Sequence, residues 1–360
     1  MSSLEVINPA TEQVLATVPA HDAAAVDDAV ARTRAAQRRW AALAPAERAG
    51  ALRDFAAVVE AHRDELAALE VANCGHPINQ AEWEAGNVRD VLLYYAASPE
   101  RLSGKQIPVA GGIDITFNEP LGVVGVITPW NFPMVIAGWG FAPALAAGNA
   151  VVVKPAEWTP LSTLRLAELA VEAGLPEGLL QVLPGRGPVT GERLVTHPDV
   201  RKVVFTGSTA TGTRVMELAA AQVKRVTLEL GGKSANIVFA DADLERAAAT
   251  APYGVFDNAG QDCCARSRIL VQRSVFDRFM ELFEPAVKAV VVGDPNARDT
   301  EMGPLVSKPH RDKVASYVPD DAPVAFRGSA PDGPATGSRP PCCCRGAPTA
   351  ACARRSSARW

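Results

Sequence analysis

The chain has 360 residues, which is long enough for two domains with separate hydrophobic cores. Hydrophobic residues make up 48% of it and charged residues 21%, and the formal net charge is −4, with Lys and Arg dispersed along the chain. Such a composition is ordinary for a globular protein and argues against a nucleic-acid partner. The amino terminus lacks a signal-peptide pattern, and no apolar run has the length of a membrane span. We therefore expect a cytoplasmic protein without membrane contacts.

The amino-terminal part is patterned for helices. Apolar residues recur at helical spacing over residues 22–43, 45–73 and 80–97. Pro45 suits a first helical turn, and Gly75 can provide a left-handed cap at the end of the second helix.

From residue 123 onward, short apolar runs alternate with helical patterns. The alternation predicts an α/β fold with a doubly wound, mostly parallel, Rossmann-like sheet. The expected strands cover residues 123–127, 150–153, 181–183, 203–205, 225–228, 236–239 and 268–271, and the expected helices cover 134–147, 161–173, 209–221, 244–258 and 275–290.

Two segments that follow predicted strands suit a nucleotide. The stretch from Gly207 to Gly212 is a glycine-rich turn that opens a helix, where backbone N–H groups can hold a phosphate. Its spacing differs from the usual Gly-x-Gly-x-x-Gly, so a plain strand-to-helix turn is an alternative. Lys154 and Glu157 end another strand and could bind a ribose, or form a solvated surface pair.

Three further residues suit catalysis, and each has a plainer alternative. Asn131 could donate a hydrogen bond to an oxyanion, or be a turn residue. Glu229 ends an apolar strand, where partial burial would suit a general base, or it could pair with a nearby cation. Cys263 follows a glycine-containing turn and could be an exposed thiol or a small buried residue. The histidines lack metal-ligand spacing, so we expect no metal site.

Taken together and in this order, the motifs resemble those of the NAD(P)-dependent aldehyde dehydrogenase superfamily. The similarity extends over about residues 4 to 334. Its matching segments are Asn8–Thr11, Pro129–Pro133, Lys154–Glu157, Phe205–Ser208, Leu228–Lys233 and Gly260–Cys263.

The resemblance implies catalytic roles for three residues. Cys263, the second position after Gln261, would be the nucleophile, and Cys264 its neighbour. Asn131 and the backbone N–H of Cys263 would stabilise the oxyanion, and Glu229 would be the general base. An aldehyde would then be oxidised to a carboxylic acid through a thiohemiacetal and a thioester. Glu229 argues against a relative that passes the acyl group to coenzyme A.

The resemblance also implies a cofactor site. Lys154 and Glu157 would bind the adenosine ribose, Gly207, Ser208 and Gly212 would border the pyrophosphate, and Trp130 belongs to the same site. A carboxylate at position 157 would repel a 2′-phosphate, which favours NAD over NADP. The partner would be a small aldehyde, of a kind such as an aminoaldehyde or betaine aldehyde, and members of the family are homo-oligomeric.

The resemblance further divides the chain into an NAD-binding domain at 1–230, a partial catalytic domain at 231–334 and a tail at 335–360. The tail has five Arg, four Cys and no acidic residue, and without its charges the net charge would be −9. Codons can be chosen for residues 335–344 that, when the reading frame is moved back by one base, encode Gly-Tyr-Trp-Phe-Pro-Pro-Thr-Val-Leu-Leu. The same shift applied to residues 354–360 permits Glu-Glu-Ile-Phe-Gly-Pro-Val. Both segments are typical of the family.

We therefore expect an out-of-frame, disordered tail, and the absence of part of the catalytic domain together with the strand used for oligomerisation. Exposed core faces and unpaired strand edges would make the chain poorly soluble or unstable, with weak or no activity. The alternative function is a catalytically dead fragment that retains only nucleotide or partner binding. The nucleotide sequence near residue 334 tests the frame.

Overall fold

The computed structural model describes residues 2–318, 322–331 and 341–343. Its helices are α1 (Ala23–Ala41), α2 (Pro45–Ala61), α3 (Arg63–Cys74), α4 (Ile78–Ala96), α5 (Pro133–Ala146), α6 (Leu161–Glu172), α7 (Glu192–Thr196), α8 (Thr209–Ala220), α9 (Leu244–Thr250), α10 (Tyr253–Phe256), α11 (Phe276–Ala289) and α12 (Lys308–Ala315). Its strands are β1 (Ser3–Ile7), β2 (Val14–Pro19), β3 (Gln106–Val109), β4 (Gly112–Ile115), β5 (Val123–Ile127), β6 (Ala150–Lys154), β7 (Leu180–Val182), β8 (Val200–Gly207), β9 (Arg225–Leu230), β10 (Ala235–Val238), β11 (Arg268–Val271), β12 (Val324–Arg327) and β13 (Pro341–Cys343).

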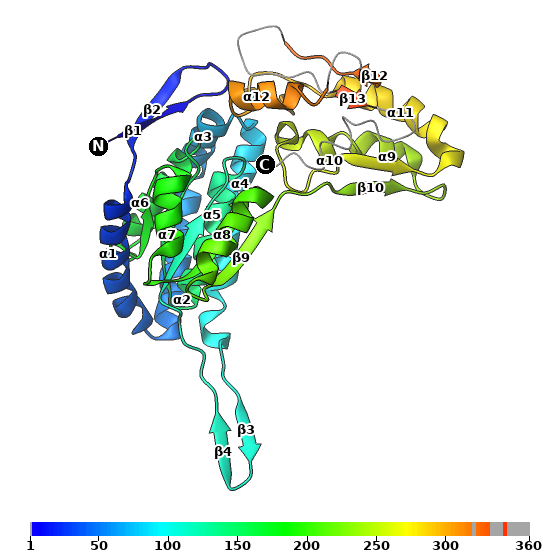
Figure 1. Ribbon diagram of the computed structural model, residues 1–360. Helices are drawn as coiled ribbons and strands as arrows, with labels where there is room; N and C mark the ends of the chain where they lie inside the picture. The colour runs from blue at the N-terminus through cyan, green and yellow to red at the C-terminus, as the bar shows by residue number, and fades with distance from the viewer. Residues whose placement is uncertain (1, 319–321, 332–340, 344–360) are drawn as a thin grey trace.

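A five-stranded parallel sheet with the order β7-β6-β5-β8-β9 forms the centre of the larger region (Figure 1). The first strand, β5, lies in the middle, and the chain adds β6 and β7 on one side before it returns to add β8 and β9 on the other. This reversal between β5 and β8 is a topological switch point, where open α/β sheets usually bind ligands beyond the carboxyl ends of the strands. The expected doubly wound α/β fold is confirmed.

Helices cover both faces of this sheet because alternate residues of its strands point to opposite sides. Val124 and Val126 of β5 face a core built with α2, α4, α5 and α6. Val123 and Ile127 of the same strand face a second core, built with α1, α7 and α8. All five residues of β5 are buried, as expected for a central strand of a parallel sheet.

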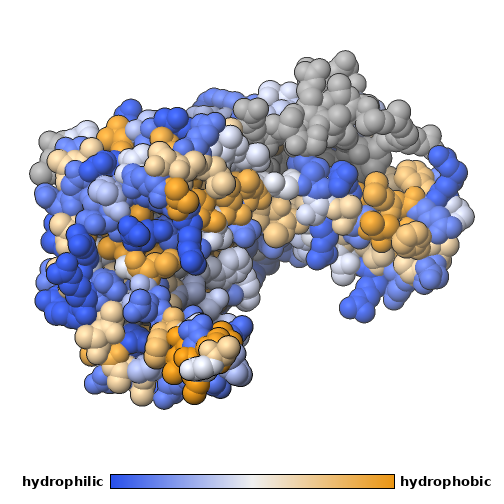
Figure 2. All heavy atoms as spheres, turned by 60° about the horizontal axis from the view of Figure 1, so that its bottom comes forward, coloured by the Kyte–Doolittle hydropathy of each residue, from blue (hydrophilic) through white to orange (hydrophobic). Residues whose placement is uncertain are grey.

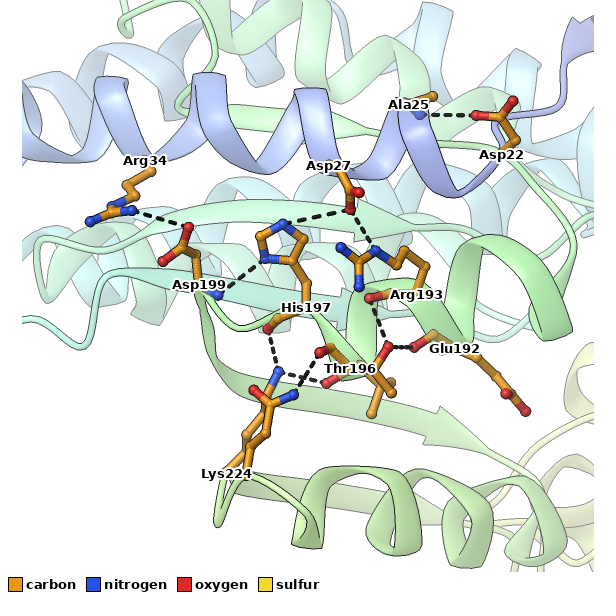
Figure 3. A network of polar contacts seen from close by, with 12 residues as sticks. Asp22, Ala25, Asp27, Arg34, Glu192, Arg193, Thr196, His197, Asp199 and Lys224 are labelled. Atoms are coloured by element: carbon orange, nitrogen blue, oxygen red, sulfur yellow. Dashed lines mark hydrogen bonds and ion pairs between the residues drawn. The ribbon is translucent and has the colours of Figure 1, made fainter.

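A polar network connects α1 and α7 to the amino ends of β8 and β9 (Figure 3). Asp27 on α1 accepts a hydrogen bond from Arg193 at 2.5 Å and lies 3.6 Å from His197. Lys224, just before β9, donates to the carbonyl oxygens of Val195 and His197. These contacts fix α1 and α7 to the start of β8 and β9, so the network is structural.

A smaller region follows β9. Its strands β10 and β11, which lie in the segment 231–334 expected to form a partial catalytic domain, pair in parallel with each other and belong to a sheet of their own. Helix α11 packs on the pair through Phe279, Phe283 and Val287, and α9 contributes Ala248 to the same core. Ile237, Phe239 and Leu270 are exposed, and hydrophobic surface is visible on this part of the molecule (Figure 2).

Two expected helices are shorter than the apolar pattern predicted. The helix expected over 45–73 is divided at His62, whose φ of −105° and ψ of 18° leave the helical region. The helix expected over 244–258 ends at Thr250, because Pro252 follows and the chain then turns into a left-handed conformation at Asn258. Gly75, with a φ of 81°, caps α3 as predicted.

The sequence did not indicate the two antiparallel hairpins, β1–β2 and β3–β4. Every residue of β3 and β4 is exposed, and this hairpin projects away from the body of the protein (Figure 1). Residues that bury neither face give no apolar alternation by which a strand can be recognised. Among the described residues, no helix is both long and apolar enough to cross a membrane.

Most of the segment 335–360, which we expected to be an out-of-frame and disordered tail, lies outside the described residues. Residues Pro341–Cys343 are described as β13, a strand antiparallel to β12. Backbone pairing along an available strand edge does not depend on side-chain type, so composition alone could not predict it.

Candidate functional site

A cleft of about 730 Å³ opens at the carboxyl ends of the parallel strands. It lies at the switch point between β5 and β8 and reaches across to the turn before β11. The cleft brings together eight of the nine residues singled out from the sequence, which come from distant parts of the chain: Trp130, Asn131, Lys154, Glu157, Gly207, Ser208, Glu229 and Cys263.

Lys154 and Glu157 follow β6 on one side of the cleft. The Lys154 side chain is 5% exposed, and its ammonium donates to the carbonyl oxygen of Pro155 at 2.8 Å. Burial lowers the pKa of Lys154 to about 8, against the opposing effect of the Glu157 carboxylate. Glu157 accepts a hydrogen bond from the backbone N–H of Gly187 at 3.0 Å. The carboxylate is thereby fixed beside the ammonium at the cleft wall.

The glycine-rich turn connects β8 to α8. A side chain at Gly207 would meet the Phe205 ring, with the added Cβ only 2.7 Å from a ring carbon, so only glycine fits there. Ser208 is the N-cap of α8, and its hydroxyl accepts from the backbone N–H of Thr211 at 3.2 Å. Gly212 lies one turn further along and packs against Leu230, where a Cβ would come within 2.7 Å. Gly212 therefore brings α8 close to β9 and is not among the cleft-lining residues.

Trp130 and Asn131 lie in the loop after β5. The Asn131 amide donates to the backbone oxygen of Gln261 at 2.7 Å, which occupies one of its two N–H groups. The Trp130 ring lies 5.9 Å from the Trp158 ring and 4.7 Å from that of His310. The loop is thus held on both sides, and the second N–H of Asn131 can serve a ligand.

The turn that leads to Cys263 has an uncommon backbone. Asn258, Ala259 and Gly260 have φ values of 48°, 56° and 76°, and this left-handed region is strained for a residue such as alanine. Gln261 stabilises the turn: its amide nitrogen donates to the Asn258 carbonyl at 3.1 Å, and its amide oxygen accepts from the N–H of Val306 at 2.9 Å. The strain is retained at the point where the chain must present Cys263 to the cleft.

Cys263 is half-buried, and Cys264 beside it is exposed. The two Sγ atoms are 3.7 Å apart. Burial raises the pKa of Cys263 to about 12, and the negative charge of Asp262 adds to this effect. The thiol of Cys263 is therefore protonated at neutral pH in this arrangement and must lose its proton before it can act as a nucleophile.

Glu229 does not have the partial burial that the sequence suggested. Its side chain is exposed, although it lines the cleft. The reason is its position near the end of β9, the outermost strand of the sheet, which no further strand covers in the part of the chain that the structure describes. Glu229 faces the cleft as a solvated carboxylate.

A buried cluster of two carboxylic acids and a histidine lies behind the Trp130–Asn131 loop. His76 Nδ1 is 2.6 Å from a carboxyl oxygen of Glu84, and the His76 ring lies 5.5 Å from Phe132 of the loop. Burial raises the pKa of Glu70 to about 7 and that of Glu84 well above its usual range, while burial lowers the pKa of His76. The cluster is therefore largely uncharged at mildly acidic pH.

Sequence reasoning missed several residues of the cleft. Trp158 and the segment around Gly187 line the cleft, and the buried Gln261 holds the turn that leads to Cys263. The glycine- and proline-rich stretch at 184–188 was an available signal, because it follows a third predicted strand at the same edge of the sheet. Gln261 belongs to the matching segment Gly260–Cys263, but its role as an anchor depends on contacts with Val306 and Asn258 that only the fold brings about.

The fold and the cleft define a class of protein with a dinucleotide-type sheet and a cysteine at the edge of the nucleotide cleft. The model of the aldehyde dehydrogenase family matches residues 1–325. This chain belongs to the aldehyde dehydrogenase family, as the resemblance of its motifs predicted.

Particular relatives agree with this assignment. The chain is 42% identical to aminoaldehyde dehydrogenase 2 of Pisum sativum and to betaine aldehyde dehydrogenase of Amaranthus hypochondriacus. Each alignment covers 91% of this chain and 68% of the relative, so the chain spans about two thirds of their length.

Solved structures are similarly close. PnpE of Pseudomonas sp. WBC-3, in complex with nicotinamide adenine dinucleotide, is 42% identical with a TM-score of 0.89, over 93% of this chain and 70% of PnpE. A betaine aldehyde dehydrogenase of Staphylococcus aureus in complex with NAD⁺ is 36% identical with a TM-score of 0.88, over 93% and 70%.

Proposed function

We propose that the chain oxidises a small aldehyde to a carboxylic acid with NAD, and that Cys263 is its nucleophile. The observation that carries this proposal is the convergence of Asn131, Glu229 and Cys263 on one cleft, from three separate segments of the chain. The family to which the chain belongs, and the NAD bound to its solved relatives, support the same reaction.

The residues of the cleft fit the dinucleotide. The cleft volume lies within the range of cofactor sites, and the turn at Gly207 has no side chain above its backbone at the start of α8. Lys154 and Glu157 would hold the adenosine ribose through its hydroxyls. The Glu157 carboxylate would repel a 2′-phosphate, so we propose NAD in preference to NADP. When bound, NAD supplies the acceptor for the hydride that the aldehyde carbon must lose.

The protein's own groups account for the remaining chemistry. The Cys263 thiol loses its proton to solvent, and its sulfur attacks the carbonyl carbon to form a thiohemiacetal. The free N–H of Asn131 and the backbone N–H of Cys263 stabilise the negative charge that develops on the carbonyl oxygen. After oxidation the acyl group is held on sulfur as a thioester. Glu229 accepts a proton from the water that hydrolyses this thioester.

Two observations favour an aldehyde that carries a positive charge. Asp262 lines the cleft directly beside Cys263, and its carboxylate would attract an ammonium group close to the reacting carbonyl. The two plant relatives are named for aminoaldehyde and betaine aldehyde. We therefore expect Asp262→Asn to raise KM about two- to fivefold for betaine aldehyde and to leave KM for propanal unchanged.

NADH formation with a panel of aldehydes tests the proposal. Cys263→Ser should lower the rate by at least about 10³-fold. The matched variant Cys264→Ser, which alters the neighbouring thiol, should retain most of the activity. Equal losses in the two variants would contradict the assignment of the nucleophile.

The alternative is a fragment that binds nucleotide but does not catalyse. It is favoured by the raised pKa of Cys263 and by the exposure of Glu229. Calorimetry with NAD separates the two functions: binding without any NADH formation from the panel would establish the alternative. Binding together with Cys263-dependent NADH formation would establish the enzyme.

A further inference from the structure

Three potential metal ligands lie next to one another at the turn before β11. One ligand atom each from Asp262, Cys263 and Cys264 lies within 4.8 Å of the others. The two sulfur atoms are 3.7 Å apart, and the backbone N–H of Cys264 donates to Asp262 Oδ1 at 3.0 Å. The carboxylate is thus held beside both thiols before any ligand arrives.

These donors can be reached from two sides. Cys263 and Asp262 line the main cleft, whereas Cys264 and Asp262 line a second cavity of about 160 Å³. Tyr253, Asp257 and Arg266 also line the second cavity, so its wall is polar and carries a further carboxyl group and a guanidinium group. An ion could therefore approach the paired thiols through the second cavity, without first entering the cleft.

We propose that Asp262, Cys263 and Cys264 bind a thiophilic divalent cation such as Zn²⁺ or Cd²⁺. Two Zn–S bonds of about 2.3 Å at a tetrahedral angle span about 3.8 Å between the sulfur atoms, close to the observed separation. A carboxylate oxygen of Asp262 is the third ligand, and water takes the fourth position. Two metal–sulfur bonds form, and the two thiol protons leave to solvent.

The charges of the three donors favour a cation at this place, although the Arg266 guanidinium in the wall of the second cavity opposes it. A carboxylate and two sulfur atoms are gathered within a few ångströms, and each becomes a better partner when a positive ion neutralises its neighbours. A cation bound there would occupy the sulfur of Cys263 and compete with any electrophile for it. The inference goes beyond aldehyde oxidation, because it needs only the three donors and would hold in a chain without activity.

Peptide-resolved alkylation tests the site in the full chain. The tryptic peptide 247–266 contains only Cys263 and Cys264, so the cysteines at 342–344 and 352 do not interfere. The native chain would be treated with iodoacetamide, under a phosphine reductant, with Zn²⁺, Cd²⁺ or Mg²⁺ alone. We expect Zn²⁺ and Cd²⁺ to slow alkylation of both cysteines at least about tenfold, and Mg²⁺, which prefers oxygen ligands, to leave the rate unchanged.

Two variants make the test specific. Cys264→Ser should abolish the protection of Cys263 by Zn²⁺, with folding checked by near-ultraviolet circular dichroism. Asp262→Asn, which keeps both thiols, should raise the Zn²⁺ concentration needed for protection about tenfold. The proposal would be overturned if neither ion protected the native chain, or if Cys263 were protected equally well in Cys264→Ser.

Discussion

The larger and smaller regions of this protein both consist of parallel strands covered by helices. The strands of the two regions are buried to very different degrees. All residues of β5 and β6 are buried between two layers of helices. In β10 and β11 most residues are half-buried or exposed, and Ile237 and Leu270 are more than half exposed. Because burial of apolar surface drives folding, the two regions should differ in stability.

The two regions carry different parts of the candidate site. Lys154, Glu157 and the Gly207 turn are fixed to the fully buried sheet. Cys263 lies on a turn that belongs to the less buried region, and Gln261 anchors that turn. Nucleotide binding should therefore survive conditions under which the chemistry of the thiol fails.

Truncation of one core phenylalanine in each region should have the largest effect and should separate the two regions. Phe283 and Phe141 are both buried, each stacked on a second phenylalanine, in the smaller and the larger region respectively. Truncation of either to alanine should lower the free energy of its region's unfolding by about 3–5 kcal/mol. Phe283→Ala should leave NAD binding intact, while Phe141→Ala should weaken it. Hydrogen exchange measured by peptide, with calorimetry of NAD, checks this; loss of NAD binding in Phe283→Ala would contradict it.

The second effect concerns the buried cluster of the larger region. The folded-state pKa of Glu70, about 7, lies above its unfolded value of 4.5, so its stabilising contribution is present below pH 4.5 and is lost as the pH rises through 7. The difference corresponds to about 3 kcal/mol. Glu70→Gln should therefore reduce the loss of stability between pH 5 and pH 8, as measured by urea unfolding. The exposed Glu177→Gln is the control, and an unchanged pH dependence in Glu70→Gln would refute the account.

A smaller effect is expected at Lys154, whose folded-state pKa of about 8 lies below the unfolded value of 10.5. Burial of the charged ammonium therefore lowers the free energy of unfolding. This penalty has its full size below pH 8 and disappears above pH 10.5. Lys154→Met should remove about 3 kcal/mol of penalty at pH 7 and lose a hydrogen bond to Pro155 worth about 1 kcal/mol. We expect a more stable protein with weaker NAD binding.

Urea unfolding at pH 7 and pH 10.5 checks this prediction, with the exposed Lys105→Met as the matched control. A variant at Lys154 that is less stable at pH 7 than the native chain would show that burial does not oppose the charge as described.

The smallest effect sharpens the description of the smaller region. Burial and the charge of Asp262 hold the pKa of Cys263 at about 12. Asp262→Asn removes the charge and should raise the alkylation rate of Cys263 at each pH below its pKa, since only the thiolate reacts. Iodoacetamide labelling of peptide 247–266 between pH 7 and pH 11 compares the rates in the native chain and the variant. Equal rates would mean that burial alone sets the pKa.

The sequence predicted the larger region better than the smaller one, for a physical reason. Buried strands such as β5 read as continuous apolar runs, and their bounds could be predicted to within a few residues. The resemblance placed β10 and β11 in a partial catalytic domain that begins at residue 231, but the apolar pattern alone could not predict their pairing, because apolar content does not say which strands become neighbours. The exposed hairpin β3–β4 has no buried face and therefore no pattern.

The candidate site divides in the same way. The strand-end positions of Asn131, Lys154 and Glu157 could be predicted, because parallel strands bring their carboxyl ends to one edge. The exposure of Glu229 depends on β9 being the outermost strand, and the buried role of Gln261 depends on Val306. Both follow from tertiary neighbours that no local pattern encodes.

The proposed reaction requires that Cys263 carry the substrate as a thioester. Mass spectrometry of peptide 247–266 after incubation with NAD and an aldehyde detects this intermediate, and Glu229→Gln should slow its hydrolysis. We expect an acyl group on Cys263 that requires NAD, and more of it in Glu229→Gln. A chain that binds NAD but shows no adduct, or carries the adduct on Cys264, would overturn the proposed role of Cys263.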